Sequence, residues 1–338
     1  MEAQRIVRHH KAMRVKDRIK GGFFGIAVGD ALGVPVEFQS RQKLTENPIT
    51  GYREFGTHRQ PAGTWSDDTS LTLCLAESLT KGIDYADIGR EFVAWLYEAK
   101  WTATDVVFDV GITTKQAIDS LKKGVQADLA GPMDEYSNGN GSLMRVLPIG
   151  LYALLQPLEV RRRLAFDISS ITHGHPRAKI ACWFYCEILR NIIQGNQKAA
   201  AVDNAWTTVN DWQASNGGNS QWPFFKLCTS KIEQKPLGSI QSTGYVIDSL
   251  EAAIYCLLTT DSFQDAVIKA VNLGEDTDTV GAITGGLAGT YYGFDAIPTA
   301  FIRGLKKTTE IEELVETFIH RIPYDTQQNL PAGLVPVT

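Results

Sequence analysis

The sequence has little cysteine, few strand-like segments and no long uninterrupted apolar run. Its 338 residues contain five cysteines and no CxxC pair, which argues against a disulfide framework or a zinc site and favours buried free thiols in a reducing cytosol. Hydrophobic residues make up 43% and charged residues 21% of the chain, as in globular rather than disordered proteins. We therefore expect a soluble, cytoplasmic protein without a membrane span.

An excess of basic over acidic residues is confined to the start of the chain. The net charge is −5, of which residues 1–20 contribute +5 and the remainder −10. An acidic body argues against nucleic acid as the main ligand, because binding phosphates needs a basic face. Residues 1–20 are interpreted as a basic N-terminal extension, which is either a solvated helix end or an arm that binds a partner.

Helical periodicity recurs along the chain, whereas alternating β-branched runs are short and isolated. The sequence therefore predicts an all-α fold with short Gly- and Pro-containing connections. The segment 212–239 is interpreted as a surface insertion in a single domain. The predicted helices are 16–33, 68–81, 85–100, 110–123, 142–155, 158–172, 177–194, 199–211, 240–259, 262–272, 277–292 and 309–320.

Glycine recurs at every fourth position in two of these helices. The two rows are Gly21, Gly25, Gly29 and Gly33, and Gly281, Gly285, Gly289 and Gly293. Glycine inside a helix costs about 1 kcal/mol relative to alanine, and a ridge without side chains lets another backbone approach closely. We expect both helices to be central, packed either against each other or each against a different neighbour.

Two dense acidic segments precede apolar helices. They are Ser66-Asp67-Asp68-Thr69 and Asp276-Thr277-Asp278-Thr279. Either segment alone is explained by helix capping, but carboxylates this close repel one another unless a cation neutralises them. Oxygen ligands without His or Cys suit Mg²⁺ or Mn²⁺ better than zinc. If the segments converge, they can hold a pair of metal ions.

Three further segments are candidates for a ligand site. Glu37 follows Pro35 in a predicted loop, where it either faces a site or is an ordinary exposed acid. The Gly-rich turn 138–142 can hold a phosphate through backbone N–H groups, although a plain turn explains it equally well. His173 lies between two predicted helices, where it either contacts a substrate or caps a helix.

These segments, taken in order, resemble the ADP-ribosylglycohydrolase family, and most closely its dinitrogen-reductase-activating glycohydrolases and ADP-ribosylarginine hydrolases. The resemblance covers residues 20–290, most of the chain. It rests on Gly21-Gly22-Phe23, Gly25 to Gly33, Glu37-Phe38, Ser66 to Thr69, Asp109-Val110-Gly111, Gly139 to Arg145, Thr172 to Pro176, Gly244-Tyr245-Val246 and Gly274 to Gly281.

The resemblance implies a single compact orthogonal helical bundle over residues 21–325, followed by a tail over 326–338, with two Mg²⁺ (or Mn²⁺) ions. It implies an enzyme that removes ADP-ribose from modified protein side chains, arginine-linked rather than serine-linked because of Asp109. By resemblance, Glu37 handles protons or positions water, Asp109 acts on the substrate ribose, and Tyr245 stacks on adenine. The implied metal ligands are Ser66, Asp67, Asp68, Asp276, Asp278 and Thr279. The implied substrate-binding residues are Gly111, Asn138, Gly139, Asn140, Gly141, Ser142, His173 and Tyr245.

The sequence departs from the family pattern at Ile112, where the closest relatives have an amide. One alternative is a non-enzymatic ADP-ribose-binding or immunity-type protein that blocks an ADP-ribosylating toxin through residues 1–20. Such a protein would be expected to lose metal ligands, and the sequence retains them. Another is an enzyme that hydrolyses a free ADP-ribosyl compound rather than a modified protein.

Overall fold

The computed structural model describes residues 2–216 and 231–322, with side chains from residue 15 onward. The described residues form helices and a single isolated β-bridge, between Gly139 and Tyr245, and no extended strand. The predicted all-α fold is therefore confirmed. The helices are α1 (Glu2–Gly33), α2 (Arg41–Glu46), α3 (Asp67–Thr80), α4 (Tyr85–Glu98), α5 (Ile112–Lys122), α6 (Leu147–Tyr152), α7 (Leu158–Ser170), α8 (Pro176–Ile193), α9 (Lys198–Ser215), α10 (Val246–Leu258), α11 (Phe263–Val271), α12 (Thr277–Tyr292), α13 (Thr299–Gly304) and α14 (Thr308–Arg321). Short 3₁₀ turns lie at Val34–Val36, Ala127–Leu129, Ile232–Gln234, Leu237–Ser239 and Phe294–Ala296.

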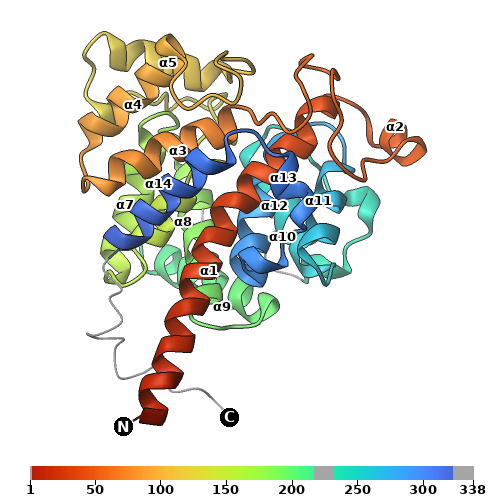
Figure 1. Cartoon of the computed structure of the whole chain (residues 1–338). Helices are drawn as coiled ribbons and strands as arrows, with labels where there is room; N and C mark the ends of the chain where they lie inside the picture. The colour runs from red at the N-terminus through yellow and green to blue at the C-terminus, as the bar shows by residue number, and fades with distance from the viewer. Residues whose placement is uncertain (1, 217–230, 323–338) are drawn as a thin grey trace.

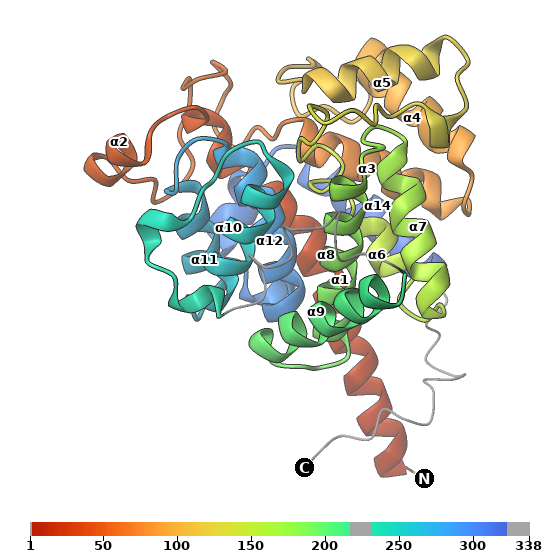
Figure 2. The same cartoon turned by 180° about the vertical axis from the view of Figure 1, so that it is seen from behind.

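Helix α1 crosses the middle of the molecule and lies along α12 (Figure 1). Helices α3, α4, α5 and α7 lie on one side of this pair and α10 and α11 on the other, as the reverse view also shows (Figure 2). The contact between α1 and α12 is the most extensive between any two described elements. The first turns of α1 project from the body of the molecule.

The two glycine rows face each other across the α1–α12 contact. A Cβ on Gly25 would come within 2.0 Å of the carbonyl oxygen of Gly285, and one on Gly29 within 2.0 Å of that of Gly281. The backbones are thus too close for any side chain in between. Of the two expected arrangements, packing of the glycine helices against each other is the one observed, and it brings the first helix of the chain against a helix near its other end.

Several predicted boundaries are wrong. Helix α1 begins at Glu2 rather than at residue 16, α6 occupies only part of the predicted 142–155 helix, and α10 begins at Val246 rather than at 240. Pro148 lies in the first turn of α6, a position that favours a helix start, while the backbone before α10 is extended and pairs with the 138–140 turn. Helix α9 continues to Ser215, inside the predicted insertion 212–239, and residues 217–230 of that insertion lie outside the described residues.

One stretch of the described chain, Val15–Val36, is long and apolar enough by length and composition to cross a membrane, and 94% of its most apolar window is buried inside the protein. Polar residues interrupt this stretch, so a search of the sequence for uninterrupted apolar runs does not find it. The other helices cover its side chains, as expected for the central helix of a bundle.

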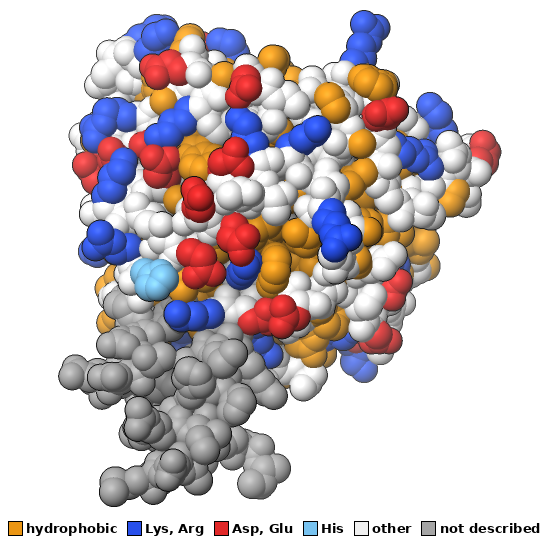
Figure 3. Space-filling view, in the orientation of Figure 1, with side chains coloured by type: hydrophobic (Ala, Val, Ile, Leu, Met, Phe, Trp, Pro, Cys, Tyr) orange, Lys and Arg blue, Asp and Glu red, His pale blue; other side chains and the backbone are white. Residues whose placement is uncertain are grey.

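The thiols of the described residues are buried, as predicted, whereas the surface charge seen from one side is mixed. On the face seen in Figure 3, acidic and basic side chains of the described residues are intermixed rather than gathered by sign. Cys74, Cys182, Cys186 and Cys256 are buried and free. Cys228 lies outside the described residues.

Candidate metal centre and active site

The two acidic segments meet, because the first turns of α3 and α12 lie against each other. Ser66 is the N-cap of α3 and Asp276 is the N-cap of α12. The Thr279 hydroxyl donates a hydrogen bond to Asp68 Oδ2 (3.3 Å), and so does the Ser66 hydroxyl (3.1 Å). All six predicted metal-ligating residues therefore lie at two adjoining helix N-termini.

Asp30 joins this group from the central helix and was not predicted as a site residue. Its carboxylate accepts hydrogen bonds from the backbone N–H of Ser66 (2.9 Å) and of Thr69 (3.0 Å) and from the Thr69 hydroxyl (2.6 Å). Carboxylate oxygens of Asp30, Asp68 and Asp278 all lie within 4.8 Å of one another. The sequence does hold one sign of this role, because Asp30 is an acid between Gly29 and Gly33 in a helix that is otherwise apolar there.

The buried carboxylates lack partners for part of their oxygens. Asp68 Oδ1 and Asp278 Oδ2 are buried without a hydrogen-bond partner among the described residues. Burial, and then the charges of neighbouring acids, raise the pKa values of Asp67, Asp68 and Asp278 well above the ordinary value. Asp30, Asp67, Asp68, Asp276 and Asp278 are called the acidic cluster below. A cluster of largely buried acids binds either protons or a cation, and its all-oxygen donors fit a hard divalent ion.

A second group of ligand atoms shares Asp278 with the first. Atoms of Glu37, His58, Asp109 and Asp278 lie within 4.8 Å of one another. Glu37 is buried, and burial raises its pKa to about 7, although the contact of its Oε2 with His58 Nε2 acts in the opposite direction. Asp109 has a positive φ of 51°, a conformation uncommon for a residue with a side chain. The structure thus places both predicted catalytic residues beside the acidic cluster.

His58 was not predicted, because its loop has no periodicity or recognisable motif. Thr57 anchors that loop to the Glu37 segment: its N–H donates to the carbonyl oxygen of Pro35 (3.0 Å) and its hydroxyl to that of Glu37 (2.7 Å). The ring of His58 lies near those of Phe38 and Phe108, with centroid distances of 6.3 and 5.2 Å. These contacts and the anchored loop keep the imidazole on Glu37.

The Gly-rich turn is hydrogen-bonded to the acidic cluster. The side-chain amide of Asn140 donates to Asp276 Oδ2 (2.7 Å) and to the Ser249 hydroxyl (2.8 Å). The N–H of Val246 donates to the carbonyl oxygen of Asn138 (3.0 Å), which places half-buried Tyr245 beside the turn. These bonds bring residues 138–140 and Tyr245 to the same edge of the site.

The remaining predicted substrate-binding residues differ in exposure. Gly111 is the exposed N-cap of α5, whose Thr114 hydroxyl would be 2.8 Å from a Cβ on Gly141. His173 is buried beneath the same glycine. The Ser142 hydroxyl is buried against Ser169 (2.9 Å) and Cys182 (3.4 Å), so it supports the turn from the core side.

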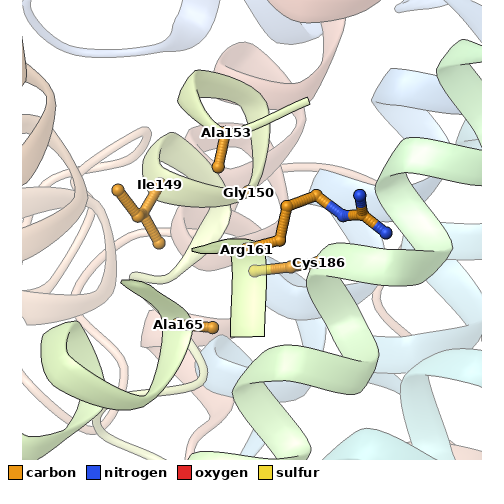
Figure 4. Close-up of a pocket in the computed structure, with 6 residues that line it drawn as sticks. All are labelled: Ile149, Gly150, Ala153, Arg161, Ala165 and Cys186. Carbon is orange, nitrogen blue, oxygen red and sulfur yellow. The ribbon is translucent and has the colours of Figure 1, made fainter. Parts of the chain in front are cut away.

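A separate hollow lies between α6, α7 and α8. It is lined by Ile149, Gly150, Ala153, Arg161, Ala165 and Cys186 (Figure 4). The guanidinium of Arg161 is occupied by the Glu187 carboxylate, with N–O distances of 2.8 and 2.9 Å. This hollow therefore presents mainly apolar surface and shares no residue with the acidic site.

The chain is similar to several known proteins. The chain is 32% identical to the ADP-ribosylarginine hydrolase Tri1 of Serratia proteamaculans, over 91% of this chain and 80% of that protein. It is 31% identical to the ADP-ribosyl-[dinitrogen reductase] glycohydrolase of Rhodospirillum rubrum, over 88% of this chain and 93% of that protein. A solved structure described as an ADP-ribosylglycohydrolase-related protein complex superposes with a TM-score of 0.76 at 32% identity, covering 91% of this chain and 99% of the other. Because the sequence model of the ADP-ribosylglycohydrolase family also matches residues 11–328, the chain belongs to that family.

Proposed function

We propose that this protein is a metal-dependent ADP-ribosylarginine hydrolase that uses two Mg²⁺ or Mn²⁺ ions to remove ADP-ribose from modified arginine side chains in the cytoplasm. The observation that carries the proposal is the convergence of Asp68 and Asp278, with buried unpartnered oxygens, beside Glu37 and Asp109. Relatives named as ADP-ribosylarginine hydrolases support the substrate class. Buried free thiols are consistent with a reducing compartment.

The oxygen donors at the two helix N-termini are the residues that would hold the metal. Bound divalent cations would orient ribose hydroxyls and make a water molecule more acidic. The proposed ligands are Ser66, Asp67, Asp68, Asp276, Asp278 and Thr279, and Asp30 fixes the first turn of α3 from behind.

Glu37 is the residue best placed to move a proton. In the hydrolysis, water adds to the anomeric carbon, the C–N bond to guanidine breaks, and the guanidine leaves with a proton. His58 occupies Oε2 of Glu37, so Oε1 is the oxygen that exchanges protons with water or the leaving group. Burial raises the pKa of Glu37 to about 7 in the metal-free protein, and bound cations nearby would favour its carboxylate form, which accepts a proton.

The acidic surroundings favour an arginine-linked substrate. Glu37 and Asp109 place two carboxylates at the site, and carboxylates pair well with a guanidinium group. A serine linkage offers no cationic group for them to bind. We therefore expect arginine-linked ADP-ribose to be cleaved faster than serine-linked ADP-ribose.

The test is hydrolysis of arginine-linked and serine-linked ADP-ribosyl peptides, with free ADP-ribose as the readout. We expect Mg²⁺-dependent release from the arginine-linked peptide and none in EDTA. Asp67→Asn and Asp278→Asn should each lower turnover by at least about 100-fold, since each removes an anionic metal donor.

Asp261→Asn is the matched control, because the side chain of Asp261 is fully exposed. Helical circular dichroism should be the same in all three variants. EDTA-resistant hydrolysis, or wild-type turnover in both site variants, would contradict the proposal.

The projecting start of α1 suggests a second role, as an arm that binds an ADP-ribosylating toxin and blocks it. Residues 1–20 carry a net charge of +5, and the first turns of α1 extend beyond the body (Figure 1). Ile19 is buried in the core, so a deletion that tests the arm should stop at residue 14. Removing residues 2–14 should weaken binding to an acidic transferase domain and leave peptide hydrolysis unchanged. Equal binding by both proteins would rule the arm out.

A further inference from the structure

His173 is held rigidly beneath the Gly-rich turn. Its N–H donates to the carbonyl oxygen of Ser169 (2.7 Å), and its own carbonyl oxygen lies 3.0 Å from the Ser169 hydroxyl. Its ring lies below the turn, since a Cβ on Gly139 would be 3.5 Å from Nε2 and one on Gly141 2.8 Å from Cε1. The side chain has little freedom to turn, so its hydrogen-bond pattern is fixed by its neighbours.

The other ring nitrogen meets a chain of two polar side chains. His173 Nδ1 lies 2.9 Å from Thr172 Oγ1, and Arg145 Nη2 donates to the same oxygen over 2.7 Å. Arginine has only donors, so Thr172 accepts from Arg145 and keeps its own hydrogen for another acceptor. Among the described residues, Nδ1 of His173 is the acceptor within its reach. A Thr172 hydroxyl that donates this hydrogen to Nδ1 satisfies both groups and places the ring hydrogen on Nε2.

Arg145 is an unusual residue for this position, because it is fully buried and has no carboxylate partner among the described residues. It stacks on Phe92, 4.6 Å from the ring centre, and donates to the carbonyl oxygen of Ile168 (3.2 Å). Its Nε and Nη1 have no hydrogen-bond partner in the described part of the chain. Burial lowers its pKa to about 10, which leaves it charged at neutral pH. Burial and this charge lower the pKa of His173 to about 3, so the imidazole is neutral.

We propose that Arg145 and Thr172 are positioning residues that fix the Nε2–H tautomer of His173, so that the ring presents a hydrogen-bond donor to an oxygen of the bound ADP-ribosyl group. The inference deepens the proposed function and rests on it for the identity of the ligand. Nε2 has no acceptor among the described residues and lies at Gly139, beside the acidic cluster. The buried charge of Arg145 behind the ring adds a positive potential that favours an anionic or electron-rich oxygen.

The tautomer is tested first, without any substrate. Long-range proton–nitrogen correlation spectra of the full chain with ¹⁵N-labelled histidine distinguish a protonated from an unprotonated ring nitrogen, and His173→Gln identifies the signal. We expect Nε2 protonated and Nδ1 unprotonated at neutral pH. Thr172→Val, which removes the hydroxyl at nearly constant volume, should give a mixture of tautomers, and Thr172→Ser should restore the wild-type pattern. A wild-type Nδ1–H tautomer would overturn the proposal.

Ligand affinity is tested second, by calorimetric titration with ADP-ribose in Mg²⁺ buffer. Thr172→Val should bind about fivefold to tenfold more weakly, which is the loss of one hydrogen bond, and Thr172→Ser should bind as tightly as wild type. Thermal melts show whether each variant is folded. Unchanged affinity in Thr172→Val with a changed tautomer would refute the donor role. If the wild-type protein does not bind ADP-ribose, the proposed function fails, whereas the spectra still decide whether Arg145 and Thr172 set the tautomer.

Discussion

At the scale of single residues, the contact between His58 and Glu37 controls where the proton of the site resides. Burial alone raises the pKa of Glu37, and the nearby carboxylates of Asp109 and Asp276 raise it further, whereas His58 lowers it. The same contact raises the pKa of His58. Each group therefore affects the protonation of the other, and the imidazole also fixes the orientation of the carboxylate.

We expect His58→Ala to lower kcat about 10- to 100-fold, as is typical for outer partners of catalytic groups, while KM changes little. The reason is that Glu37 loses its orientation but the groups that hold the substrate remain. His58→Gln keeps a donor for Glu37 and should recover part of the rate. The measurement is steady-state hydrolysis across pH. Equal losses in both variants, or a rise in KM without a fall in kcat, would show that His58 does not act through Glu37.

At the scale of elements, the contact between α1 and α12 positions the acids of the proposed metal site. Gly33 lies against the backbone of Asp278 and Thr277, where a Cβ would come within 2.3 Å. The same close approach puts Asp30, one turn earlier on α1, beside the first turn of α3. The glycine rows thus align three helices so that their acids face one another.

Gly285→Ala should destabilise the protein by about 1–3 kcal/mol or more, because the new Cβ would lie 2.0 Å from the Gly25 carbonyl oxygen. The sign of the change in the free energy of unfolding separates packing from helix propensity, because alanine is about 1 kcal/mol more favourable than glycine in an unpacked helix. Gly51→Ala is the control, because a Cβ there meets no atom within 4 Å. Urea unfolding curves measure both, and a stabilised Gly285→Ala variant would contradict the packing.

Local sequence patterns predict those parts of this arrangement that depend on one element at a time. Periodicity gives most helices, glycine spacing gives the central pair, and acids at helix starts give Asp68 and Asp278. Asp30 and His58 escape prediction because their roles arise from tertiary contacts with segments distant in the chain, 36 residues away at Ser66 and 21 residues away at Glu37. The turns of α1 before residue 16 lie outside the predicted helix 16–33, although the charge pattern of residues 1–20 allows a solvated helix end there.

At the scale of the whole molecule, the described part of the fold buries far more acidic than basic side chains. Beyond residue 20 the chain has a net charge of −10, and the central acids are inside rather than on the surface. Arg145, the buried base, lies behind His173 rather than among these acids. The metal-free protein must therefore bind protons at the acids that are proposed to bind cations.

The stability of the metal-free protein should therefore fall as the pH rises. Burial raises the pKa of Asp30 to about 7 from 3.8 and that of Glu37 to about 7 from 4.5. Between the ordinary and the raised pKa of each group, the native state binds more protons than the unfolded chain. The free energy of unfolding therefore falls as the pH rises. In EDTA, we expect the Tm to be on the order of 5 °C lower at pH 8 than at pH 6.

Added Mg²⁺ should reverse most of that loss at pH 8, because it replaces the missing protons with a cation. Asp278→Asn removes one of the charges that faces Asp68, so in EDTA its Tm should vary less between pH 6 and pH 8, and its response to Mg²⁺ should be smaller. Scanning calorimetry at the two pH values, with and without Mg²⁺, measures all four quantities. If the metal-free wild-type Tm rose from pH 6 to pH 8 and Mg²⁺ left it unchanged, the buried acids would be neutralised by some other group, and the proposed metal centre would have no role in holding the N-termini of α3 and α12 together.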